Sequence, residues 1–227
     1  MPQWKHLFVG TIKQCMAMER ESIKTIWSNN WAEPFFKRRL IQAIVLWILV
    51  LIAFPIFFNY IGGRNGVSLN DRLLAYLPRY NVSVPTFLII WSMSLWFIYR
   101  AIHKPKMLLL FMWGFVVLSL SRFLTIYLVA LNPPADLIPL MDPITNLFYG
   151  GTSHFITKDL FYSGHTSTQF LIFLCFTKKT DKILALIATC LIGILVLIQH
   201  IHYSIDVFAA PVMCYGVFLI SKRIVSN

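Results

Sequence analysis

The chain has 227 residues, of which 58% are hydrophobic and only 13% are charged, an apolar fraction well above that of soluble globular proteins. This composition makes the lipid bilayer the expected solvent and leaves room for one membrane domain, without a separate soluble domain of ordinary size. The net charge of +11 does not indicate a nucleic-acid partner, because no nucleic-acid-binding motif is present and membrane proteins carry basic residues in their cytoplasmic loops.

The first predicted element is an N-terminal cytoplasmic arm, residues 1–39, which precedes a long apolar run starting at Leu40. Because this run begins so late, we expect an uncleaved membrane anchor and no signal peptide. Apolar residues recur about every four positions in the arm, which predicts an amphipathic helix on the inner leaflet; a solvated arm is the alternative. These residues are Trp4, Phe8, Ile12 and Met16, followed by Ile23, Ile26 and Trp27.

Six apolar segments follow the arm, most of them close to the 20 or so residues that a helix needs to cross a bilayer. They lie at 40–61, 85–102, 107–131, 160–177, 183–200 and 203–221. The sequence therefore predicts an all-α polytopic membrane protein with six transmembrane helices over residues 40–221, followed by a short cytoplasmic tail at 222–227.

Basic residues are distributed very unevenly between the segments that connect these helices. Fifteen Lys and Arg residues lie in segments on the same side of the membrane as the N-terminus, and four lie on the other side. Those four are Arg64, Arg72, Arg79 and Lys158. The positive-inside rule then places both termini in the cytoplasm, and the long outer segments 62–84 and 132–159 are expected to cover a site at the outer helix ends.

The four cysteines do not indicate a disulfide framework or a metal site. Cys175, Cys190 and Cys214 lie inside apolar segments, and Cys15 lies in the N-terminal arm. None has the spacing of metal ligands, so we expect these residues to act as small apolar side chains.

Ionisable side chains are costly inside a membrane, so each one needs a reason. The predicted spans contain four that stand out: Arg122, His165, His202 and Asp206. His202 and Asp206 are four residues apart, which places them on one face of a helix and lets the carboxylate fix the tautomer of the imidazole. Such a pair serves a nucleophilic or basic histidine, or it is a buried pair that only joins helices.

His165 lies near the outer end of the fourth predicted span, on the same side of the membrane as His202. With that helix starting at residue 160, His165 would lie about 9 Å below the helix start, at a depth similar to that of Asp206. The three groups are therefore expected to converge in one layer. Small or hydroxylated residues flank the histidine: Ser163, Gly164 and Thr166.

Arg122 lies in the outward half of the third span and needs an anionic partner. A carboxylate such as Asp159 or Asp206, or a substrate phosphate, would serve. Two histidines, a carboxylate and an arginine suit phosphoryl transfer through a phosphohistidine, in which one imidazole attacks phosphorus and the other protonates the leaving oxygen. We expect no cofactor; a metal at the His–Asp pair is the alternative, although no further ligands have suitable spacing.

Two stretches carry a resemblance to a known family. They are Lys158-Asp159-Leu160-Phe161-Tyr162-Ser163-Gly164-His165-Thr166 and His202-Tyr203-Ser204-Ile205-Asp206-Val207. Together they resemble the signature motifs of the sphingomyelin synthase family, a branch of the type 2 phosphatidic acid phosphatase superfamily, and the resemblance extends back through Arg122. The phosphatase branch has a Lys-x6-Arg-Pro motif and an arginine shortly after its Ser-Gly-His. Neither is present here, which favours the synthase branch.

The resemblance implies six membrane helices, both chain ends in the cytosol and an outward-facing site, in agreement with the topology above. By position, it implies that His202 is the nucleophile, Asp206 its partner and His165 the proton donor to the leaving group. The residues expected to bind the substrate or its phosphate are Arg122, Asp159, Ser163, Gly164, Thr166 and Tyr203.

We therefore expect a lipid phosphotransferase that moves a phospho-head group from a membrane phospholipid to ceramide or diacylglycerol. A lipid phosphatase or phospholipase C-type hydrolase would share the first half-reaction, and a non-catalytic lipid-binding membrane protein is a second alternative. The site is expected on the non-cytoplasmic face, in a bacterial inner membrane by preference or in a eukaryotic secretory membrane. The sequence leaves the oligomeric state open.

Overall fold

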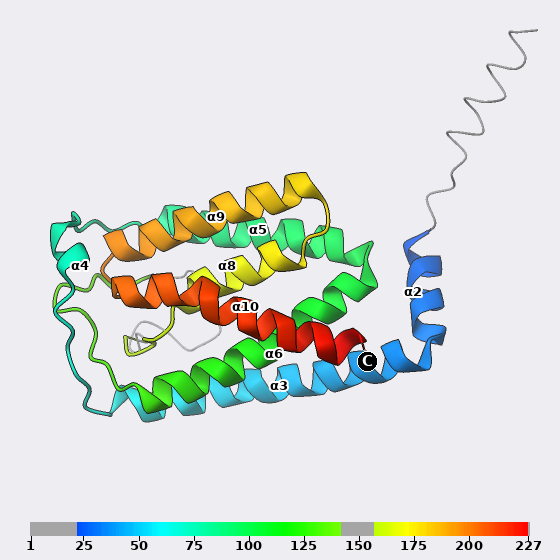
Figure 1. Cartoon of the computed structure of the whole chain (residues 1–227), viewed down its shortest axis with the longest axis horizontal. Coiled ribbons are helices and arrows are strands. Elements are labelled where there is room, and N and C mark those ends of the chain that lie inside the picture. The colour runs from blue at the N-terminus through cyan, green and yellow to red at the C-terminus, as the bar shows by residue number, and fades with distance from the viewer. Residues whose placement is uncertain (1–21, 142–156, 227) are drawn as a thin grey trace, which may run out of the picture.

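The computed structural model describes residues 22–141 and 157–226, and within these ranges the chain is helical apart from turns, loops and one bridge between Val67 and Leu131. The helices are α2 (Ile23–Ala32), α3 (Pro34–Gly62), α4 (Arg72–Tyr76), α5 (Ser83–Ile102), α6 (Pro105–Leu128), α8 (Gly164–Cys175), α9 (Lys179–Ile198) and α10 (Ser204–Ser226). They form an elongated bundle, with α2 standing across one end (Figure 1). The all-α fold class predicted from the sequence is confirmed.

Five of these helices are long and apolar enough to cross a membrane: α3, α5, α6, α9 and α10. Their outward sides carry large exposed apolar residues, such as Ile52 and Ile56 of α3, as a lipid-facing surface requires. The chain is thus an integral multi-pass membrane protein. Two helices extend at least five residues beyond the predicted bounds, since α3 starts at Pro34, where proline suits the first helical position, and α10 runs through Ser226.

The segment predicted as a fourth span at 160–177 forms a much shorter helix. α8 has 12 residues, which corresponds to a length of about 18 Å, well below the roughly 30 Å of the hydrocarbon core. All of its residues are buried or half-buried, and non-helical backbone is tolerated at membrane depth where protein encloses it. The expectation of a full-length fourth span is therefore not met, and His165 lies in the first turn of α8 instead of deep within a helix.

Four neighbouring helices enclose α8, and each of them touches a different side of it (Figure 1). The contacts are Leu171 against Gly114 of α6, Thr166 near Gly193 of α9, the Ser167 carbonyl accepting from the Cys214 thiol of α10, and His165 beside Phe87 of α5. Gly114 has no room for a side chain, because a Cβ there would lie 2.8 Å from a methyl carbon of Leu171. The close packing makes α8 the core of the bundle.

The short helix α2 is attached to the bundle through Trp27. The indole Nε1–H donates to the carbonyl of Ile102 at the end of α5 (2.8 Å), and the ring packs against a buried cluster formed by α3 and α6. Ile23 and Ile26 also lie in α2. The other apolar positions of the predicted interfacial helix (Trp4, Phe8, Ile12 and Met16), together with Cys15, lie outside the described residues.

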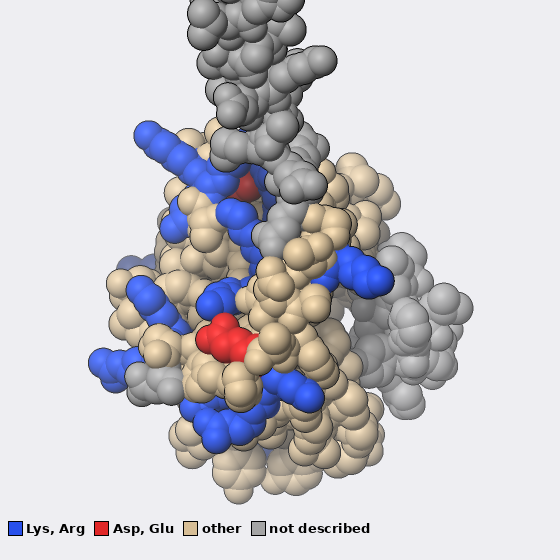
Figure 2. Space-filling model, turned by 90° about the vertical axis from the view of Figure 1, so that its right-hand side faces the viewer, with Lys and Arg blue, Asp and Glu red and all other residues tan. Residues whose placement is uncertain are grey.

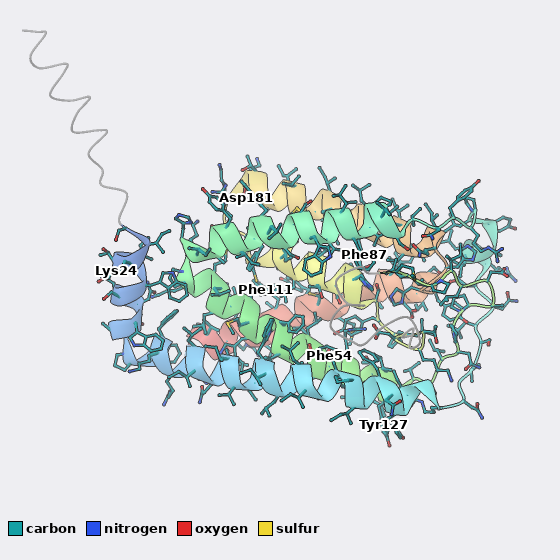
Figure 3. All side chains as sticks on the ribbon, turned by 180° about the vertical axis from the view of Figure 1, so that it is seen from behind. Lys24, Phe54, Phe87, Phe111, Tyr127 and Asp181 are labelled. Atoms are coloured by element: carbon teal, nitrogen blue, oxygen red, sulfur yellow. The ribbon has the colours of Figure 1, made fainter. Side chains whose placement is uncertain are left out.

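Lys and Arg side chains gather at the end of the bundle that carries α2 and the C-terminus, where acidic side chains are few (Figure 2). The described basic residues of these segments are Lys24, Lys37, Arg38, Arg39, Arg100, Lys104, Lys106, Lys178, Lys179, Lys182, Lys222 and Arg223. Figure 3 shows Lys24 and Asp181 toward this end and Tyr127 toward the other. The uneven charge read from the sequence thus corresponds to the two ends of one bundle.

An ion pair joins α5 to α9 at the basic end. Arg100 Nε lies 2.9 Å from Asp181 Oδ2, and Arg100 Nη2 donates to Asp181 Oδ1 at 3.0 Å. The guanidinium also lies over the ring of Trp96, 4.8 Å from its centroid. Because the Asp181 side chain is only 7% exposed, the pair is a fixed connection and not a solvated surface contact.

At the opposite end, Asp71 connects the outer loop to the start of α10. Its Oδ1 accepts from the N–H groups of Leu73 and Leu74, which caps α4, and its Oδ2 accepts from the N–H of Ser204 at 2.5 Å. Partial burial acts to raise the pKa of Asp71, but the hydrogen bonds from Ser204, Leu74 and Leu73 outweigh it and hold the pKa below its ordinary value of 3.8. The ionised carboxylate thus holds the loop onto α10.

We predict that Asp181→Asn destabilises the protein by on the order of 2 kcal/mol, because it leaves the half-buried Arg100 guanidinium without its counter-charge. Glu33→Gln is the matched control, since the Lys106–Glu33 pair is exposed on both sides and should contribute about 1 kcal/mol or less. Thermal unfolding in detergent measures both. Equal losses in the two variants would contradict a structural role for the Arg100–Asp181 pair.

We predict that Asp71→Asn lowers the thermal stability at neutral pH, and that the difference from wild type shrinks as the pH is lowered past 3.8. A carboxyl whose pKa is lowered by folding stabilises the protein above its ordinary pKa, and this contribution is lost as the pH falls through the folded-state pKa. Melting temperatures of both proteins along a pH series measure it. A difference that stays constant below 3.8 would contradict the assignment.

Candidate active site

His202 and Asp206 form a buried pair at the start of α10, at the end of the bundle opposite α2. The His202 Nδ1–H donates to Asp206 Oδ2 at 3.3 Å, and the two side chains are 3% and 0% exposed. Asp206 Oδ2 also accepts from the N–H of Tyr203 at 3.1 Å. The helix begins at Ser204, so the predicted pairing forms across the helix N-terminus, where the macrodipole favours a carboxylate.

The second histidine is brought to this pair through the backbone. The N–H of Ser163, which caps α8, donates to the carbonyl of Asp206 at 3.0 Å. This bond places the first turns of α8 and α10 side by side. The rings of His165 and His202 have centroids 6.4 Å apart and are inclined by 65°, so they are neighbours but too far apart to hydrogen-bond to each other. The predicted convergence of His165, His202 and Asp206 is therefore present in the geometry.

Ser163 and Thr166 use their hydroxyl groups within the first turn of α8. Ser163 Oγ accepts from the N–H of Thr166 and from Thr166 Oγ1, at 3.4 and 3.1 Å, and the Ser163 carbonyl accepts from Ser167 Oγ at 2.7 Å. The cap thus satisfies backbone groups that a helix start leaves unpaired. These contacts give both residues a structural role, and phosphate binding by them stays a prediction.

Arg122 reaches from α6 onto the start of α8. Its Nε donates to the carbonyl of Tyr162 at 3.1 Å, and its Nη2 pairs with the Asp159 carboxylate. A Cβ at Gly164 would lie 2.6 Å from the Cζ of Arg122, so the guanidinium rests directly on the glycine backbone. Asp159 and Asp206 were the two carboxylates considered as partners of Arg122. In the structure Arg122 pairs with Asp159, and Asp206 pairs with His202.

The segment that leads into α8 is held against α6 by hydroxyl groups beside Arg122. Ser121 Oγ and the Tyr162 hydroxyl lie 2.6 Å apart, and Thr125 Oγ1 donates to the carbonyl of Phe161 at 3.0 Å. Phe161 has a positive φ of 54°, a backbone state that is unfavourable for a bulky residue and persists where its surroundings fix it. Hydroxyl groups close to Arg122 in an otherwise apolar span were the only sequence signal for this attachment.

Tyr203 and Phe87 complete the immediate surroundings of the histidines. The Tyr203 hydroxyl donates to the carbonyl of Asn132 and accepts from the N–H of Leu69, so it joins two outer loops and does not point at the histidine pair. Phe87 of α5, which Figure 3 labels, lies edge-on to His165 with centroids 6.4 Å apart. The sequence pattern did not identify Phe87, because an apolar residue in an apolar span carries no signal of its own.

The site residues have no arrangement that would hold a metal ion. Within residues 22–141 and 157–226, no group of three or more His, Cys, Asp and Glu side chains is suitably placed. Asp206 Oδ1 is buried and makes no hydrogen bond with any described residue. What the described site offers is a tautomer-fixed imidazole, a second imidazole, a buried carboxylate and an arginine on a helix N-terminus, which are the groups needed for phosphoryl transfer.

Comparison with curated proteins found no match for this chain. A family model does match, and its range contains every residue of the site except those that α5 and α6 supply. Residues 158–223, from the loop before α8 through most of α10, match the family described as PAP2 superfamily C-terminal, a family that includes sphingomyelin synthase-like proteins.

Proposed function

We propose that this membrane protein is a lipid phosphotransferase that moves a phospho-head group from a phospholipid to a lipid alcohol through a phosphohistidine on His202. The observation that carries the proposal is the His202–Asp206 hydrogen bond, with His165 at a centroid distance of 6.4 Å. The PAP2 superfamily match supports it, because that match is consistent with a membrane lipid phosphatase or phosphotransferase.

In the first half-reaction, His202 Nε2 is the attacking atom, because Nδ1 is held by Asp206. A bond forms between Nε2 and phosphorus, and the bond between phosphorus and the glycerol oxygen of the donor breaks. His165 gives its proton to that oxygen, so that diacylglycerol leaves as a neutral alcohol. The buried carboxylate of Asp206 stabilises the positive charge that develops on the His202 ring as the new bond forms.

In the second half-reaction, the same groups act in reverse. The hydroxyl of an acceptor lipid loses its proton to His165, its oxygen bonds to phosphorus, and the bond to His202 Nε2 breaks. Water in place of the lipid alcohol would give hydrolysis and release the phosphorylated head group. The two outcomes share every residue described above, so they differ in what reaches the phosphohistidine once the first product has left.

Arg122 is assigned to the phosphoryl oxygens. Its guanidinium already neutralises Asp159, but Gly164 brings it onto the first turn of α8, next to His165. A helix N-terminus with an adjacent arginine favours a negatively charged group, and this charge increases on the oxygens of the transferring group in the transition state. Glycine is thus required at position 164, because any other amino acid would place a Cβ where the Arg122 guanidinium lies.

The orientation of the site follows from the charges at the two ends. If the basic end with α2 lies in the cytoplasm, then His165, His202 and Asp206 lie toward the non-cytoplasmic face. With α8 as a short sixth element enclosed by α5, α6, α9 and α10, both termini are cytoplasmic. The donor and acceptor lipids would then enter from the outer leaflet, in a bacterial inner membrane by preference.

We predict that purified wild-type protein, exposed briefly to a phospholipid labelled in its phosphate, carries label on histidine, and that His202→Ala carries none. His165→Ala should react with the natural lipid about 100- to 10,000-fold more slowly, because the proton donor is missing. It should react nearly normally with an analogue whose leaving group is nitrophenolate, which needs no proton. Labelling and product analysis by mass spectrometry measure these effects.

Equal labelling of wild type and His202→Ala would sink the phosphohistidine mechanism. If His165→Ala slowed the reaction equally with the natural lipid and with the nitrophenolate analogue, His165 would not be the proton donor. The same incubations, run with and without ceramide or diacylglycerol, separate transfer from hydrolysis, since only transfer gives an acceptor-dependent phospholipid. Consumption of no lipid by wild type would favour the non-catalytic alternative.

We predict that Gly164→Ala lowers phosphoryl transfer at least about 10-fold, because its methyl group would overlap the Arg122 guanidinium and move it away from the helix. Gly216→Ala is the matched control: this exposed glycine of α10 has no neighbour within 4 Å of an added Cβ, so the change should leave activity intact and stabilise the helix slightly. Initial rates and melting temperatures measure both. Full activity in Gly164→Ala would contradict the role of the Arg122 contact.

A further inference from the structure

One buried polar group of α8 has no use in the reaction described above. Gln169 is 1% exposed, and its Oε1 accepts no hydrogen bond from any residue in the described part of the chain. A buried carboxamide oxygen without a hydrogen bond destabilises a protein, and an apolar residue of similar size would avoid that cost. An unsatisfied buried oxygen of this kind, one helical turn from His165, is available to bind a polar group of a ligand at the site.

The position of Gln169 relative to the histidine is fixed by the helix. Residues four apart lie on one face, so Gln169 follows His165 along α8, about 6 Å farther from the outer end. The same face looks toward α5, because His165 lies beside Phe87 near the outer end and Phe176 beside Phe97 near the inner end. The carboxamide therefore lies between two levels of aromatic packing, deeper in the bilayer than the phosphoryl-transfer centre.

A lipid that places its reacting oxygen at His165 brings a second polar group toward this depth. In a glycerolipid or a sphingoid lipid, the carbon next to the one bearing the reacting oxygen carries an ester or an amide linkage to an acyl chain. Either carbonyl can accept a hydrogen bond from Gln169 Nε2. The two lipids differ in what they offer to Oε1, because an ester supplies no donor, whereas an amide supplies its N–H.

We propose that Gln169 is a specificity-determining residue that hydrogen-bonds the acyl linkage of the acceptor lipid and favours acceptors with a donor besides the hydroxyl that reacts. The inference rests on the proposed function, in which an alcohol replaces diacylglycerol at the same phosphohistidine. The ester linkage of diacylglycerol offers no donor to Oε1, whereas the amide N–H of an N-acylated amino alcohol donates to it. The Gln169 carboxamide thereby favours the amide-linked lipid as the acceptor in the second half-reaction.

The test is Gln169→Met in the full-length protein, with ceramide and diacylglycerol of matched acyl chains as the acceptors. We expect the ratio of kcat/KM for ceramide over that for diacylglycerol to fall about 10-fold, while histidine labelling by the donor, an ester-linked lipid, falls less than the rate with ceramide. The melting temperature should stay level or rise by about 2–4 °C, because an unpartnered amide has been removed. Gln169→Asn, which keeps a carboxamide, should recover part of the selectivity.

Thr189→Val is the control, since Thr189 is a buried residue of α9 whose hydroxyl already donates to the carbonyl of Ala185. It should leave the acceptor ratio unchanged. A ratio that is also unchanged in Gln169→Met, with labelling intact, would overturn the inference and leave the proposed function standing. Reduced labelling with an unchanged ratio would assign the carboxamide to the donor and overturn the acceptor role. Failure of wild type to label or consume lipid would overturn both proposals.

Discussion

The hydrogen bond from the Ser163 N–H to the Asp206 carbonyl joins the starts of two helices that are far apart in the chain. Through it, α8 and α10 have their N-terminal ends side by side. His165 lies in the first turn of α8, and His202 lies two residues before the start of α10. Two helix dipoles then present their positive ends to one region inside the bundle. With the Arg122 guanidinium on the first turn of α8, this region favours an anionic group.

The two ends of the bundle are held together by different kinds of interaction. At the basic end, a two-pronged ion pair joins α5 to α9. At the opposite end, neutral carboxamides join the loops beside the ionised Asp71: the Gln199 carboxamide bonds to Val82, Ser83 and Pro139, and the Asn132 carboxamide bonds to both backbone groups of Gly66.

Much of the fold could be predicted from hydropathy and charge, because the bilayer demands long apolar helices and the loops carry a sign preference. The His202–Asp206 pair was also predictable, since four-residue spacing is a local property. The length of α8 could not be predicted, because an apolar run indicates that a segment is shielded from water but not whether lipid or protein surrounds it. Here no residue of α8 is exposed, and the helix stops short of the membrane thickness.

Within the site, the limits of sequence reasoning coincide with contacts between distant segments. Arg122 had two candidate carboxylates, and only the packing of α6 against the 157–163 segment gives it Asp159. Asp71 lies in a different loop from the residues it holds at the start of α10. Gln169 was passed over because a polar residue on a helix is unremarkable until its neighbours are known to leave it without a partner.

The enclosure of α8 has a consequence for how the protein is made. A 12-residue helix is too short to settle in a bilayer alone, and two of the four helices that surround it, α9 and α10, are synthesised after it. Its burial therefore waits until α10 has been made, and α10 with the segment that leads into it also delivers His202 and Asp206. A nascent chain that has inserted only its earlier helices therefore holds His165 without the two groups that pair beside it.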